Sequence, residues 1–201
     1  MSTLILIRHG QSIYNLENRF TGSLDVDLTA LGKQESELAA QKIMNFKFDF
    51  AYTSTLKRAK ESLQIILTTI HQNNIKIIAN QALNERNYGS LQGLNKAETI
   101  AKCGFKQVEI WRRSYNIRPP EGESLEDTYN RTISFYKLEI ESKLKSNKTI
   151  LIVAHGNSLR ALVMYLENIS QEEICNLNIP TGVPKKYIFD ENLKILEVRY
   201  L

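Results

Sequence analysis

Leu4-Ile5-Leu6-Ile7-Arg8-His9-Gly10 is the stretch that decides the fold, because the chain repeats its pattern as Ile150-Leu151-Ile152-Val153-Ala154-His155-Gly156. Each apolar run is typical of a buried strand closed by a glycine. The carboxyl ends of parallel strands face the ligand crevice of an open α/β sheet. A single histidine at such a strand end is more often structural or solvent-facing, but a matched pair favours one shared site. The arginine beside His9 indicates that the shared ligand is an anion.

Strand patterns alternate with helical patterns along the rest of the chain, which predicts an α/β fold with a largely parallel sheet. The expected strands are Thr3–Ile7, Phe48–Thr53, Ile75–Ala79 and Thr149–Ala154, and the expected helices are Thr29–Met44, Thr55–Thr69, Ser124–Leu144 and Ser158–Glu167. Lys186–Phe189 and Ile195–Tyr200 are expected to form a closing hairpin at the sheet edge.

Two helix starts carry capping signals. Thr29 is a plausible N-cap, and Ser124 with Asp127 resembles a capping box. Within the helix that follows Thr29, the apolar side chains that fall roughly on one face, and are therefore expected to face the core, are Leu31, Leu38, Ile43 and Met44.

Composition bounds the class of protein. The 201 residues suffice for one domain, residues 1–201, and no linker or repeat divides them; 42% hydrophobic and 24% charged residues are ordinary for a globular protein. Cys103 and Cys175 are too few for a disulfide framework. No signal peptide or membrane-spanning run is evident, so a cytoplasmic enzyme is expected. The net charge of +4 is spread along the chain, which argues against nucleic-acid binding.

The stretch Leu83–Pro120 is irregular, with two short helical patterns near Lys96–Lys102 and Lys106–Ser114. A long segment without a clear strand in a compact domain is often functional. Its candidate site residues are Glu85, Lys96, Arg112 and Arg113. Taken alone, a glutamate such as Glu85 is more often a solvated carboxylate, and Trp111–Arg113 is also readable as a solvated helix face.

The loop after His9 is rich in hydrogen-bond donors, and Gly10 would let the backbone come close to a ligand. Arg8 offers a planar fork for phosphate oxygens, and Arg58, just inside a helix after a strand, is expected in the same crevice. Taken alone, the loop is also readable as a polar turn, and an arginine in a first helical turn such as Arg58 is more often a surface residue.

These residues favour phosphoryl transfer. A neutral imidazole is a competent nucleophile near pH 7, and attack on a phosphoryl group gives a labile phosphoramidate. Arg8, Arg58 and His155 would stabilise the equatorial oxygens, and Glu85 would supply the proton for the leaving hydroxyl. No carboxylate cluster or His/Cys spacing suggests a metal site.

Longer motifs carry a resemblance. Asn15–Gly22, Tyr88–Thr99, Trp111–Arg113, Ala154–Val163 and Leu177–Pro184, together with Arg8-His9-Gly10, are similar to the cofactor-dependent phosphoglycerate mutases of the histidine phosphatase superfamily. The resemblance implies a three-layer α/β/α sandwich with a mostly parallel sheet and an antiparallel edge strand. It also implies interconversion of 2- and 3-phosphoglycerate in glycolysis and gluconeogenesis, primed by 2,3-bisphosphoglycerate without a metal. Family relatives are often oligomers, so a homodimer is expected.

The resemblance also assigns roles. His9 is the phosphorylated nucleophile, Glu85 the proton donor and acceptor, and His155 the stabiliser of the transition state, with Arg8 and Arg58 beside them. The residues expected to bind the phosphoglycerate are Gly10, Gln11, Ser12, Asn15, Thr21, Gly22, Arg86, Asn87, Tyr88, Lys96, Arg112, Arg113, Gly156 and Asn157.

The chain departs from the mutase pattern in three places. Pro119-Pro120 runs almost directly into Glu121–Leu125, where mutases usually have an insertion; the sequence stops at Leu201; and Asn87 stands where many mutases have histidine. The first two departures suggest an open site that leaks phosphate by hydrolysis. A phosphomonoesterase of the same superfamily is the alternative function, and a phosphate-binding module without activity is a third. Lys96, Arg112 and Arg113 favour the mutase, because a general phosphatase needs no carboxylate clamp.

Overall fold

A six-stranded sheet organises the computed structural model, which describes residues 1–201. Its strand order is β3-β2-β4-β1-β5-β6. The strands are β1 (Ser2–Arg8), β2 (Phe50–Thr53), β3 (Lys76–Ala79), β4 (Thr149–Ala154), β5 (Lys185–Phe189) and β6 (Ile195–Tyr200). β1 to β4 are parallel, whereas β5 and β6 form the antiparallel hairpin. The predicted sheet is confirmed, and its central strands are continuously apolar because both faces are covered.

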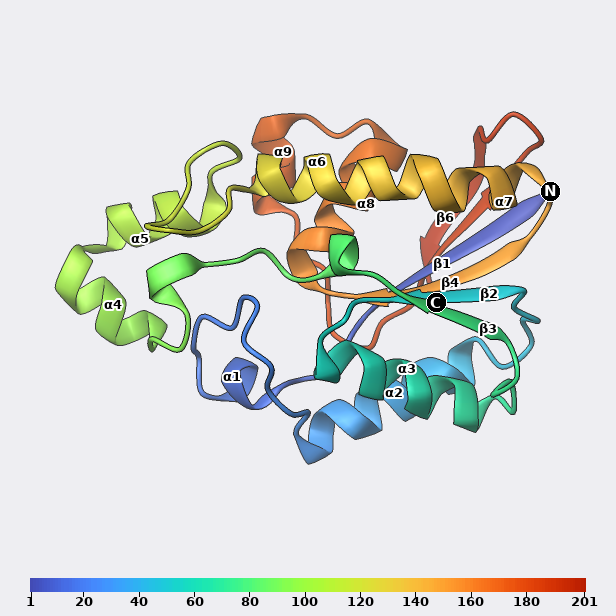
Figure 1. Ribbon diagram of the computed structural model, residues 1–201, viewed down its shortest axis with the longest axis horizontal. Helices are drawn as coiled ribbons and strands as arrows, with labels where there is room; N and C mark the ends of the chain where they lie inside the picture. Colours follow the sequence, from blue (N-terminus) through green and yellow to red (C-terminus); the bar gives the residue numbers. More distant parts are fainter.

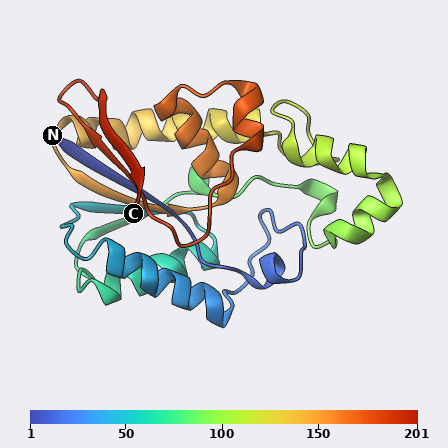
Figure 2. The ribbon, with the colours of Figure 1, turned by 180° about the vertical axis from the view of Figure 1, so that it is seen from behind.

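Helices cover both faces of the sheet (Figures 1 and 2). One layer holds α2 (Ala30–Lys42) and α3 (Lys57–Thr69). The other holds α6 (Leu125–Phe135), α7 (Glu141–Lys145), α8 (Gly156–Glu167) and α9 (Gln171–Asn176). A buried apolar cluster lies on each side of the sheet, which confirms the three-layer architecture.

The two predicted caps are confirmed. The Thr29 side chain accepts a hydrogen bond from the Gly32 amide at the start of α2. Ser124 and Asp127 form a reciprocal capping box at the start of α6. Each cap satisfies a backbone amide that has no partner within its own helix.

The predicted buried face of α2 is wrong. Leu31, Leu38 and Met44 are each about half exposed, and of the four apolar side chains only Ile43 is buried. The buried positions of α2 are instead small, namely Gly32, Ser36, Ala39 and Ala40. Small side chains let α2 approach its neighbours closely, so shape rather than hydrophobicity selects the face that packs.

The predicted helix Ser124–Leu144 is not uniform. Between α6 and α7 the chain makes a π-helical turn, η3 (Tyr136–Ile140). Tyr136 and Ile140 face the core, whereas Leu138 is 83% exposed. A π-turn admits an additional residue into the helix, so the buried faces of α6 and α7 are out of the phase that a continuous α-helix would give.

Short elements extend the molecule beyond the carboxyl ends of the parallel strands (Figure 1). They are α1 (Ile13–Leu16), α4 (Lys96–Cys103) and α5 (Phe105–Arg113), with the single 3₁₀ turns η1 (Gln81–Leu83) and η2 (Gly89–Leu91). α4 and α5 confirm the two helical patterns predicted in the irregular stretch. No helix of the structure has both the length and the apolar character that a membrane crossing requires.

Candidate active site

Strand register brings the two histidines together. β1 and β4 pair so that Arg8 lies opposite Ala154, and His9 and His155 follow directly. Their ring centroids are 4.9 Å apart, and both side chains are almost fully buried. β2 pairs with β4 on its other side, with Thr53 opposite Val153, so Ser54 also follows at this edge. The matched sequence pattern therefore does place two imidazoles at one sheet edge.

His9 presents its Nε2 atom as a nucleophile. Nδ1 lies 2.7 Å from the Gly10 carbonyl, which can only accept, so Nδ1 carries the proton and Nε2 carries the lone pair. The Arg58 Nε donates toward that atom at 3.3 Å. Burial, followed by the charges of Arg58 and Arg8, lowers the pKa of His9 well below its usual value. The imidazole is therefore neutral at physiological pH and able to attack an electrophile.

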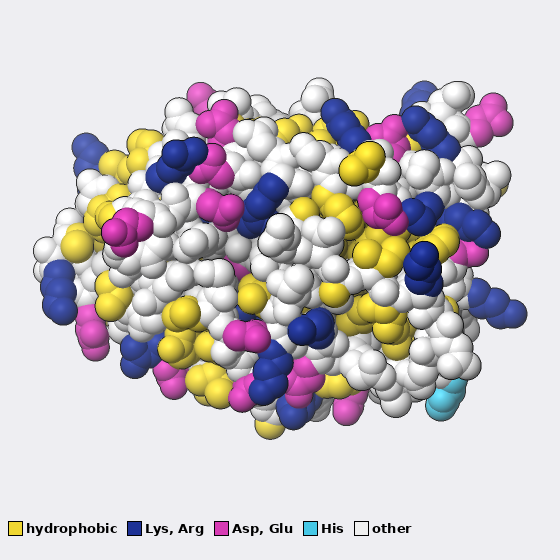
Figure 3. Space-filling view, viewed as in Figure 1, with side chains coloured by type: hydrophobic (Ala, Val, Ile, Leu, Met, Phe, Trp, Pro, Cys, Tyr) yellow, Lys and Arg dark blue, Asp and Glu magenta, His cyan; other side chains and the backbone are white.

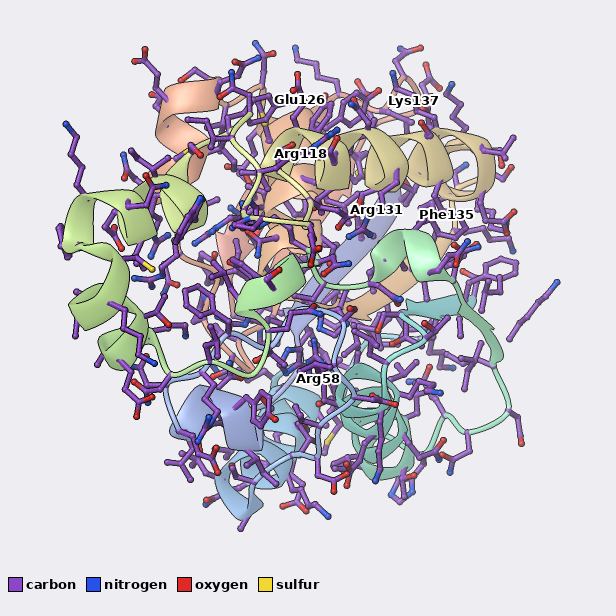
Figure 4. The ribbon with its side chains drawn as sticks, turned by 60° about the vertical axis from the view of Figure 1, so that its left-hand side comes forward. Arg58, Arg118, Glu126, Arg131, Phe135 and Lys137 are labelled. Carbon is purple, nitrogen blue, oxygen red and sulfur yellow. The ribbon has the colours of Figure 1, made fainter.

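Two arginines flank this imidazole. The Arg58 Nη atoms donate to the carbonyls of Leu24 and Gly22, both at 2.8 Å, and Figure 4 labels its side chain. Arg8 Nη1 donates to the Ile179 carbonyl at 2.8 Å, whereas its buried Nε has no partner. Burial lowers the pKa of Arg58 to about 10 and also lowers the pKa of Arg8, yet a guanidinium stays protonated at neutral pH.

His155 has one satisfied and one unsatisfied ring nitrogen. Its Nε2 lies 2.7 Å from the Ser54 Oγ, which also accepts from the Leu56 amide, and we assign the hydroxyl proton to the bond with Nε2. Nδ1 then carries a proton and, although buried, has no partner. Burial, then Arg58 and the neighbouring His9, lowers the pKa of His155 well below its usual value. His155 is therefore a neutral hydrogen-bond donor.

Glu85 is the one carboxylate in this cluster. Its Oε1 accepts from the amides of Arg86 at 2.8 Å and Asn157 at 3.0 Å. Burial raises the pKa of Glu85, but the Arg86 amide and the charges of Arg8 and Arg58 together outweigh it and lower the pKa. The side chain is therefore ionised in the free protein and able to accept a proton.

A cleft above these residues is strongly cationic. Six cations but only one carboxylate, Glu85, contribute to its walls. The cations are Arg8, Arg19, Lys96, Arg112, Arg113 and Arg160. Burial and the charge of Arg112 lower the pKa of Lys96, as expected where positive charges crowd. By contrast, basic and acidic side chains alternate over the face in Figure 3.

Most of the predicted binding residues line this cleft or its floor. Those that line it are Asn15, Thr21, Gly22, Tyr88, Lys96, Arg112, Arg113, Gly156 and Asn157. Gly156 and Asn157 form the first turn of α8, whose N-terminal amides and dipole favour an anion. His9, Arg58 and His155 lie buried beneath the cleft.

The other predicted binding residues support neighbouring backbone. A Cβ at Gly10 would stand 1.9 Å from the Gly32 carbonyl oxygen, so this glycine makes room for α2 rather than for a ligand. The Gln11 side chain accepts from the Thr29 hydroxyl at 3.0 Å. Ser12 caps α1 and is fully buried.

Arg86 and Asn87 also point away from the cleft. The buried Arg86 donates to the Trp111 carbonyl at 2.8 Å and stacks on the Tyr88 ring, 4.4 Å from its centroid. The Asn87 side chain accepts from the Gly89 amide at 2.8 Å. Arg86 therefore supports the end of α5 and the Tyr88 ring, and Asn87 shapes the turn that follows.

Sequence reasoning assigned no role to four residues that line the cleft and one beneath it. Arg19, Phe20, Arg160 and Asn178 line it, and Ser54 bonds His155 from below. Arg160 could have been found, because it lies four residues after Gly156 and therefore on the same face of α8. It donates to the Leu177 carbonyl at 2.6 Å. The structure contains no group of three or more His, Cys, Asp or Glu side chains placed to hold a metal ion.

Comparisons with known proteins agree with this geometry. The profile of the histidine phosphatase superfamily (branch 1) matches residues 4–197. The 2,3-bisphosphoglycerate-dependent phosphoglycerate mutase of Cytophaga hutchinsonii is 52% identical over 201 residues, covering 100% of this chain and 94% of that protein. The protein of the same name from Bartonella henselae is 50% identical over 195 residues, covering 96% and 95%.

Solved structures show the same fold at low sequence identity. YhfR from Bacillus stearothermophilus has a TM-score of 0.85 at 23% identity, covering 98% of this chain and 95% of its own. A mycobacterial glucosyl-3-phosphoglycerate phosphatase has a TM-score of 0.83 at 22% identity, covering 100% and 97%. The chain belongs to branch 1 of the histidine phosphatase superfamily and, within it, to the family of 2,3-bisphosphoglycerate-dependent phosphoglycerate mutases.

Proposed function

We propose that this protein is an enzyme that interconverts 2- and 3-phosphoglycerate, with His9 as the residue that carries the phosphoryl group. The observation that supports this most directly is the pairing of a neutral His9 Nε2 with two buried, unpartnered donor atoms, Arg8 Nε and His155 Nδ1. Buried donors are normally satisfied, so two orphaned donors beside a nucleophile favour a bound group with several acceptor oxygens. A phosphoryl group fits that description.

The charges of the cleft also support 2,3-bisphosphoglycerate as the priming molecule. It has two phosphates and one carboxylate, and the cleft offers six cations for them. When bound, it would supply the phosphoryl group that loads His9. Arg8, Arg58 and His155 would hold that phosphoryl group, while Lys96, Arg112 and Arg113 would hold the rest of the molecule, including its carboxylate.

Loading of His9 is a balanced displacement. The bond from Nε2 to phosphorus forms while the bond from phosphorus to the glycerate oxygen breaks. The charge on the equatorial oxygens is stabilised by Arg8, Arg58 and the Nδ1–H of His155, which are in place before the reaction. The proton of His9 stays on Nδ1, hydrogen-bonded to the Gly10 carbonyl, so the imidazole attacks as the neutral species.

Glu85 would manage the proton of the glycerate oxygen. The approach of a phosphate brings negative charge beside it and favours its protonated form, so it can donate as the oxygen leaves. In the reverse direction a hydroxyl of the monophosphate attacks phosphorus, and the Glu85 carboxylate accepts the hydroxyl proton. Return of the phosphoryl group to the other hydroxyl completes the isomerisation.

The experiment uses the purified protein with 3-phosphoglycerate, with and without a catalytic amount of 2,3-bisphosphoglycerate. Formation of 2-phosphoglycerate is followed through enolase, and free phosphate is measured in parallel. The proposal expects strong stimulation by the bisphosphate, with phosphate released by leakage more slowly than 2-phosphoglycerate forms. Steady phosphate release without stimulation would instead identify a phosphomonoesterase.

Three further expectations accompany this function as proposals. We infer that residues 1–201 act as one phosphoglycerate mutase-like domain. The homodimer expected from the family resemblance and the cytoplasmic location expected from the sequence stay predictions, which gel filtration with light scattering and cell fractionation would test.

A further inference from the structure

An arginine–carboxylate pair lies behind Glu85, outside the cleft. Arg131 is on α6, and Glu123 precedes the Ser124 cap of that helix. The Arg131 Nε lies 3.0 Å from Glu123 Oε1 and its Nη2 3.0 Å from Oε2, which makes the pair bidentate. Such a fork is stronger and more directional than a single charged hydrogen bond.

The pair is bonded to the main chain on both sides of Glu85. Arg131 Nη1 donates to the Ala82 carbonyl at 2.8 Å, and Nη2 donates to the carbonyls of Asn84 at 3.0 Å and Glu85 at 3.2 Å. Glu123 accepts from the Asn87 amide at 3.0 Å and donates its own amide to the Asn87 carbonyl at 2.8 Å.

The segment needs this support because it belongs to no strand or α-helix. Residues 84–88 connect η1 to η2, and Thr132 adds one more bond to the Ala82 carbonyl at 3.0 Å. Figure 4 shows Arg131 between α6 and this segment. The planar guanidinium therefore holds the backbone of Glu85 in place relative to α6.

We propose that Arg131, held by Glu123, is a positioning residue that sets where the Glu85 carboxyl group meets the glycerate oxygen. This inference rests on the proposed role of Glu85 in proton transfer. Arg131 does not line the cleft. Its charge is the smallest of the named causes that lower the pKa of His155, whereas its bonds to the backbone of residues 82–85 reach Glu85 directly. A displacement of about 1 Å in a catalytic group can cost roughly 100-fold in rate.

The proposal makes a prediction that depends on the leaving group. An alkoxide leaving from 2,3-bisphosphoglycerate needs the Glu85 proton, whereas the nitrophenolate of p-nitrophenyl phosphate leaves without one. Loss of Arg131 should therefore slow loading of His9 from the bisphosphate much more than loading from the aryl ester. A purely structural defect would slow both alike.

The experiment measures the first turnover of Arg131→Lys, Arg131→Met and Glu123→Gln with each donor. Phosphoenzyme from labelled bisphosphate and the burst of nitrophenolate are the two readouts. We expect Arg131→Met to lose about 10- to 100-fold with the bisphosphate, a part of the general-acid contribution, and less than about 3-fold with the aryl ester. Arg131→Lys, which keeps charge but not the fork, should fall between.

Two controls calibrate the measurement. Glu85→Gln removes the proton donor itself, so its two first-turnover rates show the largest difference between the bisphosphate and the aryl ester that loss of this proton can cause. Arg118→Met removes a comparable bidentate pair, with Asp127 of the same helix, but no bond to residues 81–87, so its ratio of the two rates should equal that of the wild type. Thermal unfolding of each variant shows that it is folded, and Glu123→Gln replaces Arg131→Met if the latter does not fold.

An equal loss with both donors, or no loss with either, overturns the proposal. Failure of the mutase function would look different. In that case the wild type would form no 2-phosphoglycerate in the enolase assay, while the first-turnover ratio would still report whether Arg131 positions Glu85.

Discussion

The two strand-histidine-glycine segments share one sequence pattern but build two different environments. At β1 the glycine is pressed against α2, and His9 bonds the Gly10 carbonyl through Nδ1, which frees Nε2. At β4 the glycine opens α8 and borders the cleft, and Ser54 bonds the Nε2 of His155, which frees Nδ1.

The difference shows that a local motif fixes where a side chain lies but not which atom is available. Gly10 and Ser54 are the partners that decide which nitrogen of each ring stays free. The Nε2 atom of His9 has a lone pair that faces the Arg58 Nε. The Nδ1 atom of His155 is a proton donor without a partner. The paired segments therefore divide the work between nucleophile and stabiliser, and substitutions in one segment should not mimic those in the other.

His9→Ala should have the largest effect, because no other group offers a nucleophilic nitrogen at this position. Labelling with ³²P from 2,3-bisphosphoglycerate should be abolished. Label retained on this variant, for example on His155, would show that the two segments are interchangeable.

His155→Ala should slow phosphoenzyme formation by about 10²- to 10³-fold, the usual cost of one preorganised donor to a transition state. His9 should still become labelled. A rapid-quench time course separates the outcomes, and an unchanged rate would mean that the free Nδ1–H does not contact the phosphoryl group.

Gly10→Ala and Gly156→Ala form a matched pair for stability. A methyl group at Gly10 would overlap the Gly32 backbone, so we expect a loss of about 1–3 kcal/mol in the free energy of unfolding. A methyl group at Gly156 meets its nearest atom, a Glu85 oxygen, at 3.5 Å, so its stability should change little while its activity falls. Urea unfolding measures the first effect and the mutase assay the second; equal stabilities would contradict the close packing at Gly10.

Both buried histidines should make stability depend on pH. Their pKa values are lowered in the folded state, so unfolding takes up protons below about pH 6.5 and the free energy of unfolding falls as the pH decreases. The slope is at most about 1.4 kcal/mol per pH unit for each histidine. The lowered pKa of Glu85 acts only below about pH 4.3, in a separate window.

Urea unfolding of the wild type between about pH 7.5 and about pH 5 should show this fall. His9→Gln and His155→Gln should each reduce the slope. His71→Asn is the control, because His71 is exposed at the end of α3 with a positive φ that asparagine tolerates. An equal slope in all four proteins would mean that neither buried histidine titrates on unfolding.

The parts of the fold that follow from local pattern were predictable. The apolar strands ending at His9 and His155 and the caps at Thr29 and Ser124 are confirmed, since each depends on a few consecutive residues. The buried face of α2 was not, because its small residues carry little hydrophobic signal and are selected by close approach. The π-turn at Tyr136–Ile140 leaves no local signal either.

The candidate site divides in the same way. His9 and His155 were identified by their positions after strands, and Glu85, Lys96, Arg112 and Arg113 by residue type within the irregular stretch. The cleft cations Arg19 and Arg160 were missed. Arg86 was expected in the cleft, but its direction depends on the Trp111 carbonyl and the Tyr88 ring, which only the tertiary structure brings near. The orphaned Nδ1 of His155 depends on Ser54, which follows β2, so sequence could not assign it.

The close contact between Gly10 and Gly32 has a consequence for engineering. A Cβ at Gly32 would stand 2.1 Å from the Gln11 carbonyl oxygen. A side chain at Gly10 would therefore overlap the backbone of α2, and a side chain at Gly32 would overlap the backbone of the loop after His9. The distance of α2 from the nucleophile loop is thus set by main-chain atoms, not by side-chain volume. The outer surface of α2, including Leu31 and Leu38, should therefore accept extensive sequence redesign, for solubility or immobilisation, without moving His9.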